Sequence, residues 1–285
     1  MADEAQLSPF VFACQGGLVL DQSTFAMQPG MALELQNFEP DISGGYRRIS
    51  GYAKWNSNIV PQTAASTEPV LMVALFNSKV IAARGTKIFE AGTTGSWSEI
   101  DTGRTSAGRY TFFRYNLAGT DFIIWADGAN NATKYDGTTV TDINASGAPA
   151  NPKFVTGFKD HLFFAGMSST PQQLTFTAPF TDNDFQTSNG AGTIKVDSNI
   201  TGLFPFRDAL FIFCEERIFK LTGSTSSDFA VQPVTREIGC LNGFTIQEFA
   251  GDIIFLGPDG LRTVAGTERI GDVELGTISR PVQKR

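Results

Sequence analysis

A short pattern returns five times along the chain: three or four apolar residues, a tight polar turn, and a second short strand-like segment. The equivalent first residues lie at intervals of 43, 39, 48 and 43 residues, and they are Val80, Ile123, Leu162, Leu210 and Ile253. A period near forty residues built from strands is typical of a β-propeller, in which each repeat forms one four-stranded blade. The repeat therefore predicts an all-β propeller.

The length of the repeating region sets the expected number of blades. About 230 residues follow Tyr46, which accommodates five blades of 40 to 48 residues, with six as the alternative if the N-terminal segment adds strands. We expect residues 1–44 to form an irregular N-terminal arm, residues 45–277 the propeller, and residues 278–285 a C-terminal tail. The strand that begins at Tyr46 has no evident upstream partner, so we expect it to pair with the last blade and close the ring.

A β-sandwich with similarly spaced hairpins is the alternative fold. Asp121, Asp160 and Asp208 each stand two residues before the repeat position, where a carboxylate is expected to accept hydrogen bonds from the turn backbone. A sandwich gives no reason for that repetition, so it favours the propeller.

Composition narrows the class of protein. A hydrophobic fraction of 41% with 25 Phe, 29 Gly and 13 Pro excludes a disordered chain and indicates many short strands joined by tight turns. The longest apolar run, residues 70–76, is far shorter than a bilayer-spanning helix, and the N-terminus lacks the basic start of a signal peptide. We therefore expect no membrane segment and synthesis in the cytoplasm.

Cysteine usage agrees with that compartment. Cys14, Cys214 and Cys240 are an odd, widely spaced set, which predicts three free thiols, with Cys214 buried behind an apolar strand. The net charge of -7 argues against affinity for nucleic-acid phosphates.

Catalytic patterns are weak throughout the sequence. His161 is the only histidine, no GxSxG accompanies it, and we interpret it as a surface residue at the start of a strand. Asp182 and Asp184 are the densest acidic pair and read as a solvated turn rather than a glycosidase or calcium site. The cysteines and the histidine show no metal-ligand spacing. We expect no catalytic residue, no cofactor and no metal, and a chain that is not an enzyme.

Sugar-binding or glycoside-cleaving propellers are the alternative function. Such a site needs carboxylates on the strands around the axis. We expect the five repeat residues on those axial strands, and they are apolar. A cellular scaffold propeller is a further alternative.

Several segments together carry a family resemblance. They are residues 16–21, 27–30, 37–40, 44–52, 158–166, 174–177, 184–185, 200–203, 207–210, 238–240 and 255–262. The ensemble resembles the propeller-bearing tail nozzle, tail-hub or head-completion proteins of tailed bacteriophages, over residues 16–281. The long nozzle proteins continue past the segment that matches Ile278–Pro281. A smaller ring or neck component is therefore an alternative to the nozzle role.

This resemblance implies a structural virion protein of the tail or neck. Several copies, expected to be a hexamer, would form a ring below the portal and adaptor, contact other tail proteins, and enclose the channel used in genome ejection. DNA would pass without specific binding, and the negative net charge fits that role because carboxylates repel the duplex.

Two sets of residues are candidates for this role. Glu215, Glu216 and Asp259 are the candidate lumen or interface acids. The candidate assembly arm carries apolar side chains that a closed propeller cannot bury, so we expect a neighbouring subunit to cover them. The alternative is that the arm packs along the propeller of its own chain. These side chains are Phe10, Phe12, Leu18, Leu20 and Phe25.

Overall fold

The computed structural model describes residues 14–41, 44–63, 68–106, 108–117, 119–264 and 278–282. The chain divides into two compact units. The first combines Met1–Ala53 with Gly276–Arg285, and the second is Lys54–Leu275.

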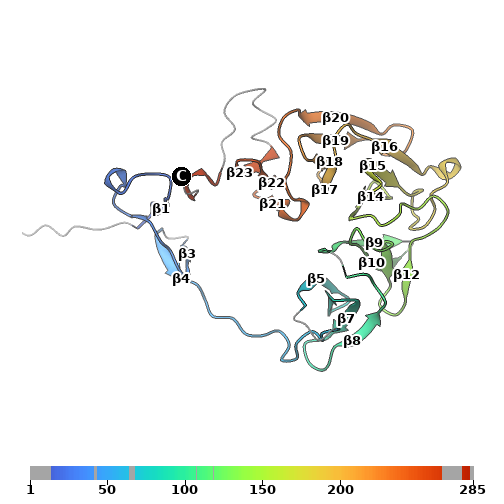
Figure 1. Ribbon diagram of the computed structural model, residues 1–285, viewed down its shortest axis with the longest axis horizontal. Helices are drawn as coiled ribbons and strands as arrows, with labels where there is room; N and C mark the ends of the chain where they lie inside the picture. Colours follow the sequence, from blue (N-terminus) through green and yellow to red (C-terminus); the bar gives the residue numbers. More distant parts are fainter. Residues whose placement is uncertain are drawn as a thin grey trace, which may run out of the picture. The chain divides into compact units, whose positions relative to one another are not determined.

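The second unit is a series of antiparallel sheets, each built from strands that follow one another in the chain (Figure 1). Four sheets have four strands, and the last has three among the residues that the structure describes. The strands of the first two sheets are β5 (Val70–Phe76), β6 (Lys79–Arg84), β7 (Lys87–Ala91) and β8 (Ser98–Asp101), then β9 (Thr111–Leu117), β10 (Thr120–Ala126), β11 (Thr133–Tyr135) and β12 (Val140–Asp142).

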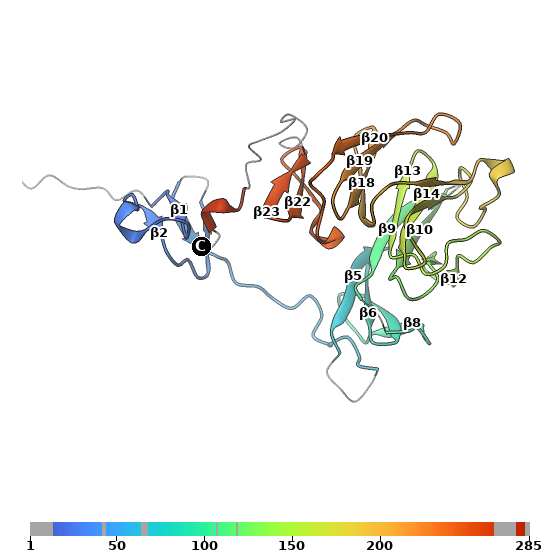
Figure 2. The same ribbon diagram turned by 45° about the horizontal axis from the view of Figure 1, so that its top comes forward.

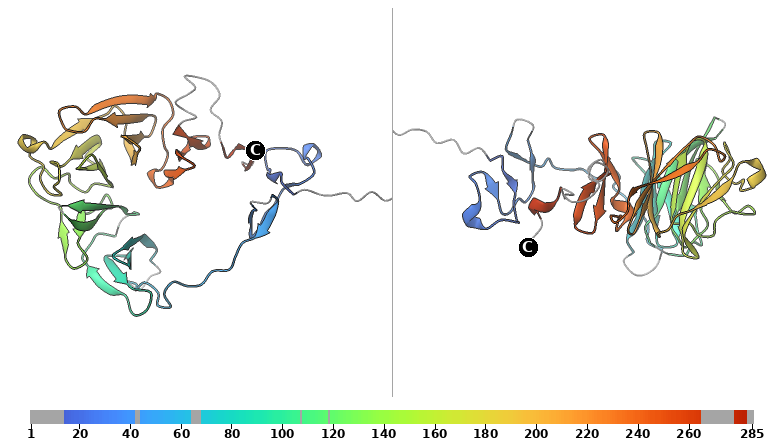
Figure 3. Two further views of the ribbon diagram at one scale, coloured as in Figure 1. Left: turned by 180° about the vertical axis from the view of Figure 1, so that it is seen from behind. Right: turned by 90° about the horizontal axis from the view of Figure 1, so that it is seen from above.

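The third and fourth sheets contain β13 (Phe154–Phe158), β14 (His161–Met167), β15 (Thr170–Phe176) and β16 (Gly192–Lys195), then β17 (Ile200–Phe206), β18 (Ala209–Cys214), β19 (Ile218–Thr222) and β20 (Ala230–Thr235). The fifth contains β21 (Gln247–Phe249), β22 (Asp252–Gly257) and β23 (Gly260–Thr263). Within this unit the sheets succeed one another around an arc, as the view from behind shows (Figure 3). Sequential four-stranded sheets arranged in this way are propeller blades, which confirms the expected fold class.

Each core lies between two blades rather than inside one. Residues on a strand alternate between its two faces, so β10 sends Ile123 and Trp125 to the first blade while Ile124 and Ala126 pack toward the third. Two further clusters join the third blade to the fourth and the fourth to the fifth. None of these four clusters of described residues joins the fifth blade to the first. The blade count of five therefore stays a prediction.

Two-residue turns connect the first and second strands of the blades. Asn77 and Ser78 have φ of 46° and 62°, and Lys159 and Asp160 have φ of 46° and 64°. Two consecutive left-handed residues form a type I′ turn, whose twist matches that of the strands it joins.

Among the described residues, the expected hydrogen bonds from these turns to the repeated aspartates are absent. No described backbone N–H donates to the carboxylates of Asp121, Asp160 or Asp208; in the second blade Asn116 Oδ1 accepts from the N–H of Gly119 instead. The turn geometry repeats, because it is set by backbone twist rather than by the aspartate side chain.

The first unit is small. Strand β1 (Gly17–Leu18) pairs in parallel with β2 (Met31–Ala32) across the 3₁₀ turn η1 (Thr24–Ala26), and β3 (Phe38–Pro40) pairs with β4 (Tyr46–Arg48). The N–H of Leu20 donates to the carbonyl of Pro281, 2.6 Å away, next to the 3₁₀ turn η4 (Arg280–Val282). Segments from both ends of the chain therefore meet in one unit (Figure 2).

This arrangement corrects two expectations. The strand at Tyr46 has an upstream partner, since Phe38 pairs with Arg48 in a two-stranded sheet of described residues. It also belongs to the first compact unit, which continues to Ala53, so residues 45–53 lie outside the propeller unit. Among the residues described in both units, no helix has the length and apolar character needed to span a bilayer.

Candidate functional site: an apolar groove on the first blade

The first blade carries an open apolar groove on the face turned away from the second blade. Its floor comes from β5 and β6, where Val73 lies opposite Ala82 and Leu75 opposite Val80. Val73 and Leu75 are 62% and 63% exposed. The groove has a volume of about 760 Å³, and its walls include Trp55, Ile59, Val60 and Trp97.

The segment before β5 forms one wall and is held by side-chain to backbone hydrogen bonds. Asn56 Nδ2 donates to the carbonyls of Gly92 and Gly95 at 3.0 and 3.2 Å, and Trp97 Nε1 donates to the carbonyl of Asn58 at 3.0 Å. Arg84 donates to the carbonyl of Val60. Because these bonds anchor the segment to the hairpins of the same blade, the groove is formed before any partner arrives.

The repeat explains why this face is apolar. Ile123, Leu162, Leu210 and Ile253 occupy the same repeat position as Val80, and each is 0% exposed in a cluster with the preceding blade. Val80 presents the same face, but it borders the groove. The groove is therefore a blade-docking face without a described blade against it.

The prediction that these five residues lie on the axial strands is wrong. They lie on the second strand of each blade, and the four later ones face the preceding blade. The strands that lie against one another at the inside of the arc are the first strands, such as β9, β13 and β17. A period of forty residues cannot indicate which strand of a blade a given residue occupies.

The inner strands enclose an aromatic hollow. Its volume is about 380 Å³, and Phe112, Phe154, Phe204 and Phe244 contribute to its lining. No Asp or Glu is among the described residues that line it. Glycoside cleavage requires a pair of carboxylates at the bond to be broken, so this hollow does not offer that chemistry.

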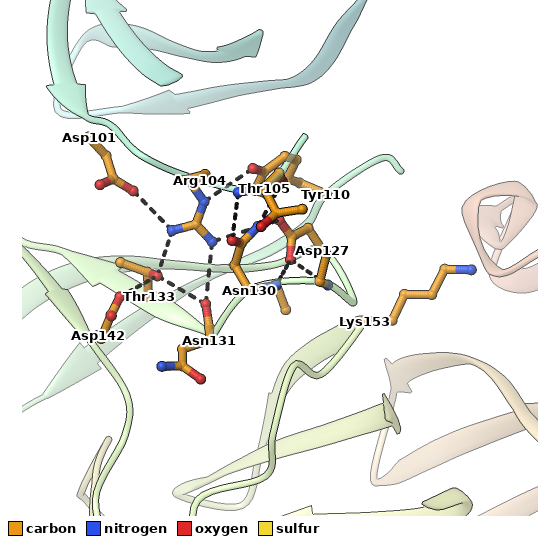
Figure 4. Close-up of polar contacts among 12 residues, drawn as sticks. Asp101, Arg104, Thr105, Tyr110, Asp127, Asn130, Asn131, Thr133, Asp142 and Lys153 are labelled. Atoms are coloured by element: carbon orange, nitrogen blue, oxygen red, sulfur yellow. Dashed lines mark hydrogen bonds and ion pairs between the residues drawn. The ribbon is translucent and has the colours of Figure 1, made fainter. Parts of the chain in front are cut away.

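A buried polar cluster joins the first two blades (Figure 4). Arg104, 7% exposed, follows β8 and reaches residues of the second blade. Its Nη1 donates to Asp101 Oδ2 at 2.9 Å and to Thr133 Oγ1 at 3.0 Å, and its Nε donates to the Tyr110 hydroxyl at 3.1 Å. Its Nη2 lies 3.8 Å from the buried carboxylate of Asp127.

The electrostatics of this cluster are those of a structural latch. Burial raises the pKa of Tyr110 to about 12, so its hydroxyl stays protonated at pH 10, where an exposed tyrosine is half ionised. Asp127 also accepts from the backbone N–H of Ala129 and Asn130, at 3.0 and 2.9 Å. Since each charged group is already engaged by neighbours in the chain, the cluster stabilises the blade junction and offers no free acid or base.

The candidate lumen or interface acids lie on equivalent turns of neighbouring blades. Glu215 and Glu216 are exposed between β18 and β19, and Glu215 accepts from Asn199 Nδ2 at 3.0 Å. Asp259, between β22 and β23, forms a bidentate ion pair with Arg262. Their placement toward a DNA channel stays a prediction.

The candidate assembly arm is only partly described. Leu18 and Leu20 are half-buried, while Phe25 is fully exposed on η1. Phe10 and Phe12 lie outside the described residues.

His161 is buried rather than on the surface, which corrects the sequence interpretation. It is 2% exposed, Nδ1 donates to the carbonyl of Thr177 at 2.6 Å, and its ring packs edge-on against Phe176 and Phe229. A histidine so enclosed cannot reach a substrate. It belongs to the core because Phe229, from the fourth blade, folds over it.

The two acidic candidates, Asp182 and Asp184, are engaged by neighbouring groups of the chain. Asp182 forms an ion pair with Lys134, and Asp184 accepts from the N–H of Gln186 at 2.9 Å and from Asn189, which lowers the pKa of Asp184. Within the described residues no three His, Cys, Asp or Glu side chains gather as metal ligands.

The cysteines are free, as expected. Cys14 is exposed, Cys214 and Cys240 are buried, and burial raises the pKa of Cys214 to about 12. The prediction of free thiols with Cys214 in the core is confirmed.

Comparison with known proteins shows the fold alone. No family model matches the sequence, and no curated protein matches it. The extracellular domain of the putative one component system BT4673 from B. thetaiotaomicron has a TM-score of 0.51 at 14% identity, over 79% of this chain and 31% of that one. The WD40 domain of Neurospora crassa Pan2 has a TM-score of 0.44 at 12% identity, over 68% of this chain and 61% of that one. The chain thus spans less than two thirds of either structure.

Proposed function

We propose that this chain is a structural component of a bacteriophage tail or neck, assembling as a nozzle- or connector-type ring around the DNA channel. In this role it contacts the adaptor or portal and other tail proteins, and it resides in the virion. The observation that carries the proposal is the groove on the first blade. The four later blades bury the corresponding face against the blade before them, whereas no described blade lies against this face of the first blade. A preformed apolar face of this kind serves protein association rather than chemistry.

Two further features support an assembly role over the sugar-binding or glycoside-cleaving alternative. The aromatic hollow at the inner strands has no carboxylate among its described lining residues. The net charge of -7 suits a wall along which DNA slides without being held. The resemblance of residues 16–281 to phage tail and neck proteins gives the proposal its particular setting.

Light scattering on the purified full chain tests the proposal. We expect a ring-sized oligomer, either alone or on addition of the portal or adaptor of the source particle. A persistent monomer near 30.8 kDa under both conditions would contradict it. Binding of that monomer to an oligosaccharide panel would then favour the alternative.

A further inference from the structure

We infer that the groove on the first blade binds a second copy of this chain, through the N-terminal unit of that copy. The inference rests on the proposed function and deepens it, because it assigns the contact that would build the ring. The groove is one half of the contact, and residues 14–53 supply the other.

The shape and chemistry of the groove indicate a β-rich apolar occupant. At the later blades the second-strand residues of the corresponding face are buried against the sheet before it, and Leu162 and Leu210 are 0% exposed. On the first blade the residue at that position, Val80, is only half-buried, and the first-strand residues Val73 and Leu75 are more than half exposed, although β5 is as apolar as any core strand. The natural complement is another small sheet that presents apolar side chains.

The first unit has the properties of that complement. Its described strands form only two-stranded sheets, which are marginally stable in isolation. Several of its large apolar side chains lack cover: Phe25 is 101% exposed, Tyr52 97%, Phe38 52% and Leu33 51%. A small unit with this much exposed aromatic surface needs a partner.

The two surfaces are different and lie on the same polypeptide, so a contact between copies is heterologous. Each copy then offers one groove and one N-terminal unit, and every contact leaves a free groove at one end and a free unit at the other. Head-to-tail association of this kind closes into a ring or continues as a filament. This is why a second copy is a better occupant than an unrelated protein: the chain carries both halves in equal number.

Photo-cross-linking between isotope-labelled and unlabelled chains identifies the segment that binds in the groove. The full chain is prepared with p-benzoylphenylalanine in place of Leu75, and ¹⁵N-labelled and unlabelled copies are mixed, assembled as in the light-scattering experiment, and irradiated. We expect cross-links to peptides from residues 14–53 that join labelled to unlabelled chains. Cross-links confined to single chains, or directed to other segments, would overturn the inference. The same amino acid at exposed Ser226, in the turn after β19, is the control and should not capture residues 14–53.

Substitution tests the same contact independently. Val73→Asp with Leu75→Asp places charges in the groove, and we expect at least a tenfold weaker association. Thermal unfolding of the unassembled chain should be unchanged, because both side chains are exposed. Leu241→Asp is the matched control, because Leu241 lies in the second unit, outside the groove, and is 57% exposed. This variant should assemble normally.

The outcomes distinguish a failure of this inference from a failure of the proposed function. If the unmodified chain never assembles, both the inference and the proposed function fail. If it assembles, but the groove variant assembles equally well, the inference fails alone.

Discussion

Replacing Arg104 with alanine should destabilise the propeller by removing the cation at the junction of the first two blades. The side chain of Arg104 is 5% exposed and that of Asp127 is 0% exposed. Breaking a buried ion pair by deleting one partner costs about 3–5 kcal/mol, because the remaining charge is left without compensation. Asp127 retains hydrogen bonds from Ala129 and Asn130, and Asp101 is partly hydrated, so the lower end applies.

The expected loss is thus about 3 kcal/mol, which in a domain of this size lowers the melting temperature by roughly 6–12 °C. Far-UV circular dichroism during heating and urea titration measures both quantities on the full chain. Lys87→Ala is the control, because its ion pair with Glu99 lies on the surface of the same blade, with side chains 35% and 40% exposed. Such a pair contributes about 0.2–1 kcal/mol.

A second substitution sharpens the test. Adding Asp127→Asn to Arg104→Ala removes the uncompensated carboxylate, so the double variant should be more stable than Arg104→Ala alone. If Arg104→Ala loses no more stability than Lys87→Ala, or if the double variant is the weaker of the two, the reasoning about a buried latch is refuted.

Three other predictions concern thiols, alkaline stability and ejection. Ellman's reagent at mildly alkaline pH should modify Cys14 quickly and Cys214 only after unfolding, since burial raises the pKa of Cys214 to about 12; equal rates would contradict the burial. Burial also raises the pKa of Tyr115 to about 12 from 10.0, so its stabilisation is complete below pH 10 and is lost as the pH rises to 12. Urea titrations across that range should show a shallower decline for Tyr115→Phe than for the unmodified chain, and identical slopes would speak against it. Glu215→Lys with Glu216→Lys should slow DNA ejection from reconstituted particles, because the channel would then attract phosphates. Unchanged ejection would remove these acids from the channel wall.

The sequence was informative wherever a local pattern decides the structure. The repeat predicted the blades because each hairpin is specified within its own forty residues. The uninterrupted apolar run from Val70 to Phe76 already signals a strand that needs cover on both faces, which is the origin of the groove. The adjacent glycines 44 and 45, with φ of 90° and 83°, lie in the connection between β3 and β4 and signal the upstream partner of the strand at Tyr46.

Contacts between blades were beyond local reasoning. His161 is buried because Phe229 covers it, and the two residues lie in different blades. Arg104 meets Asp127 across a blade junction, with no periodicity to indicate the pairing. Such pairs depend on how neighbouring sheets stack, and a single sequence does not display that stacking.

The shared cores also bear on how the chain is synthesised. In the described part of the chain each hydrophobic core lies between two blades, so each of the first four blades leaves the ribosome with an apolar sheet face that the next blade covers. At 5–20 residues per second, a blade of about 40 residues takes roughly 2–8 s to appear, and the face before it stays bare for that time. Each pause in translation lengthens this interval, and each premature stop after a complete blade releases a product that ends in an aggregation-prone sheet.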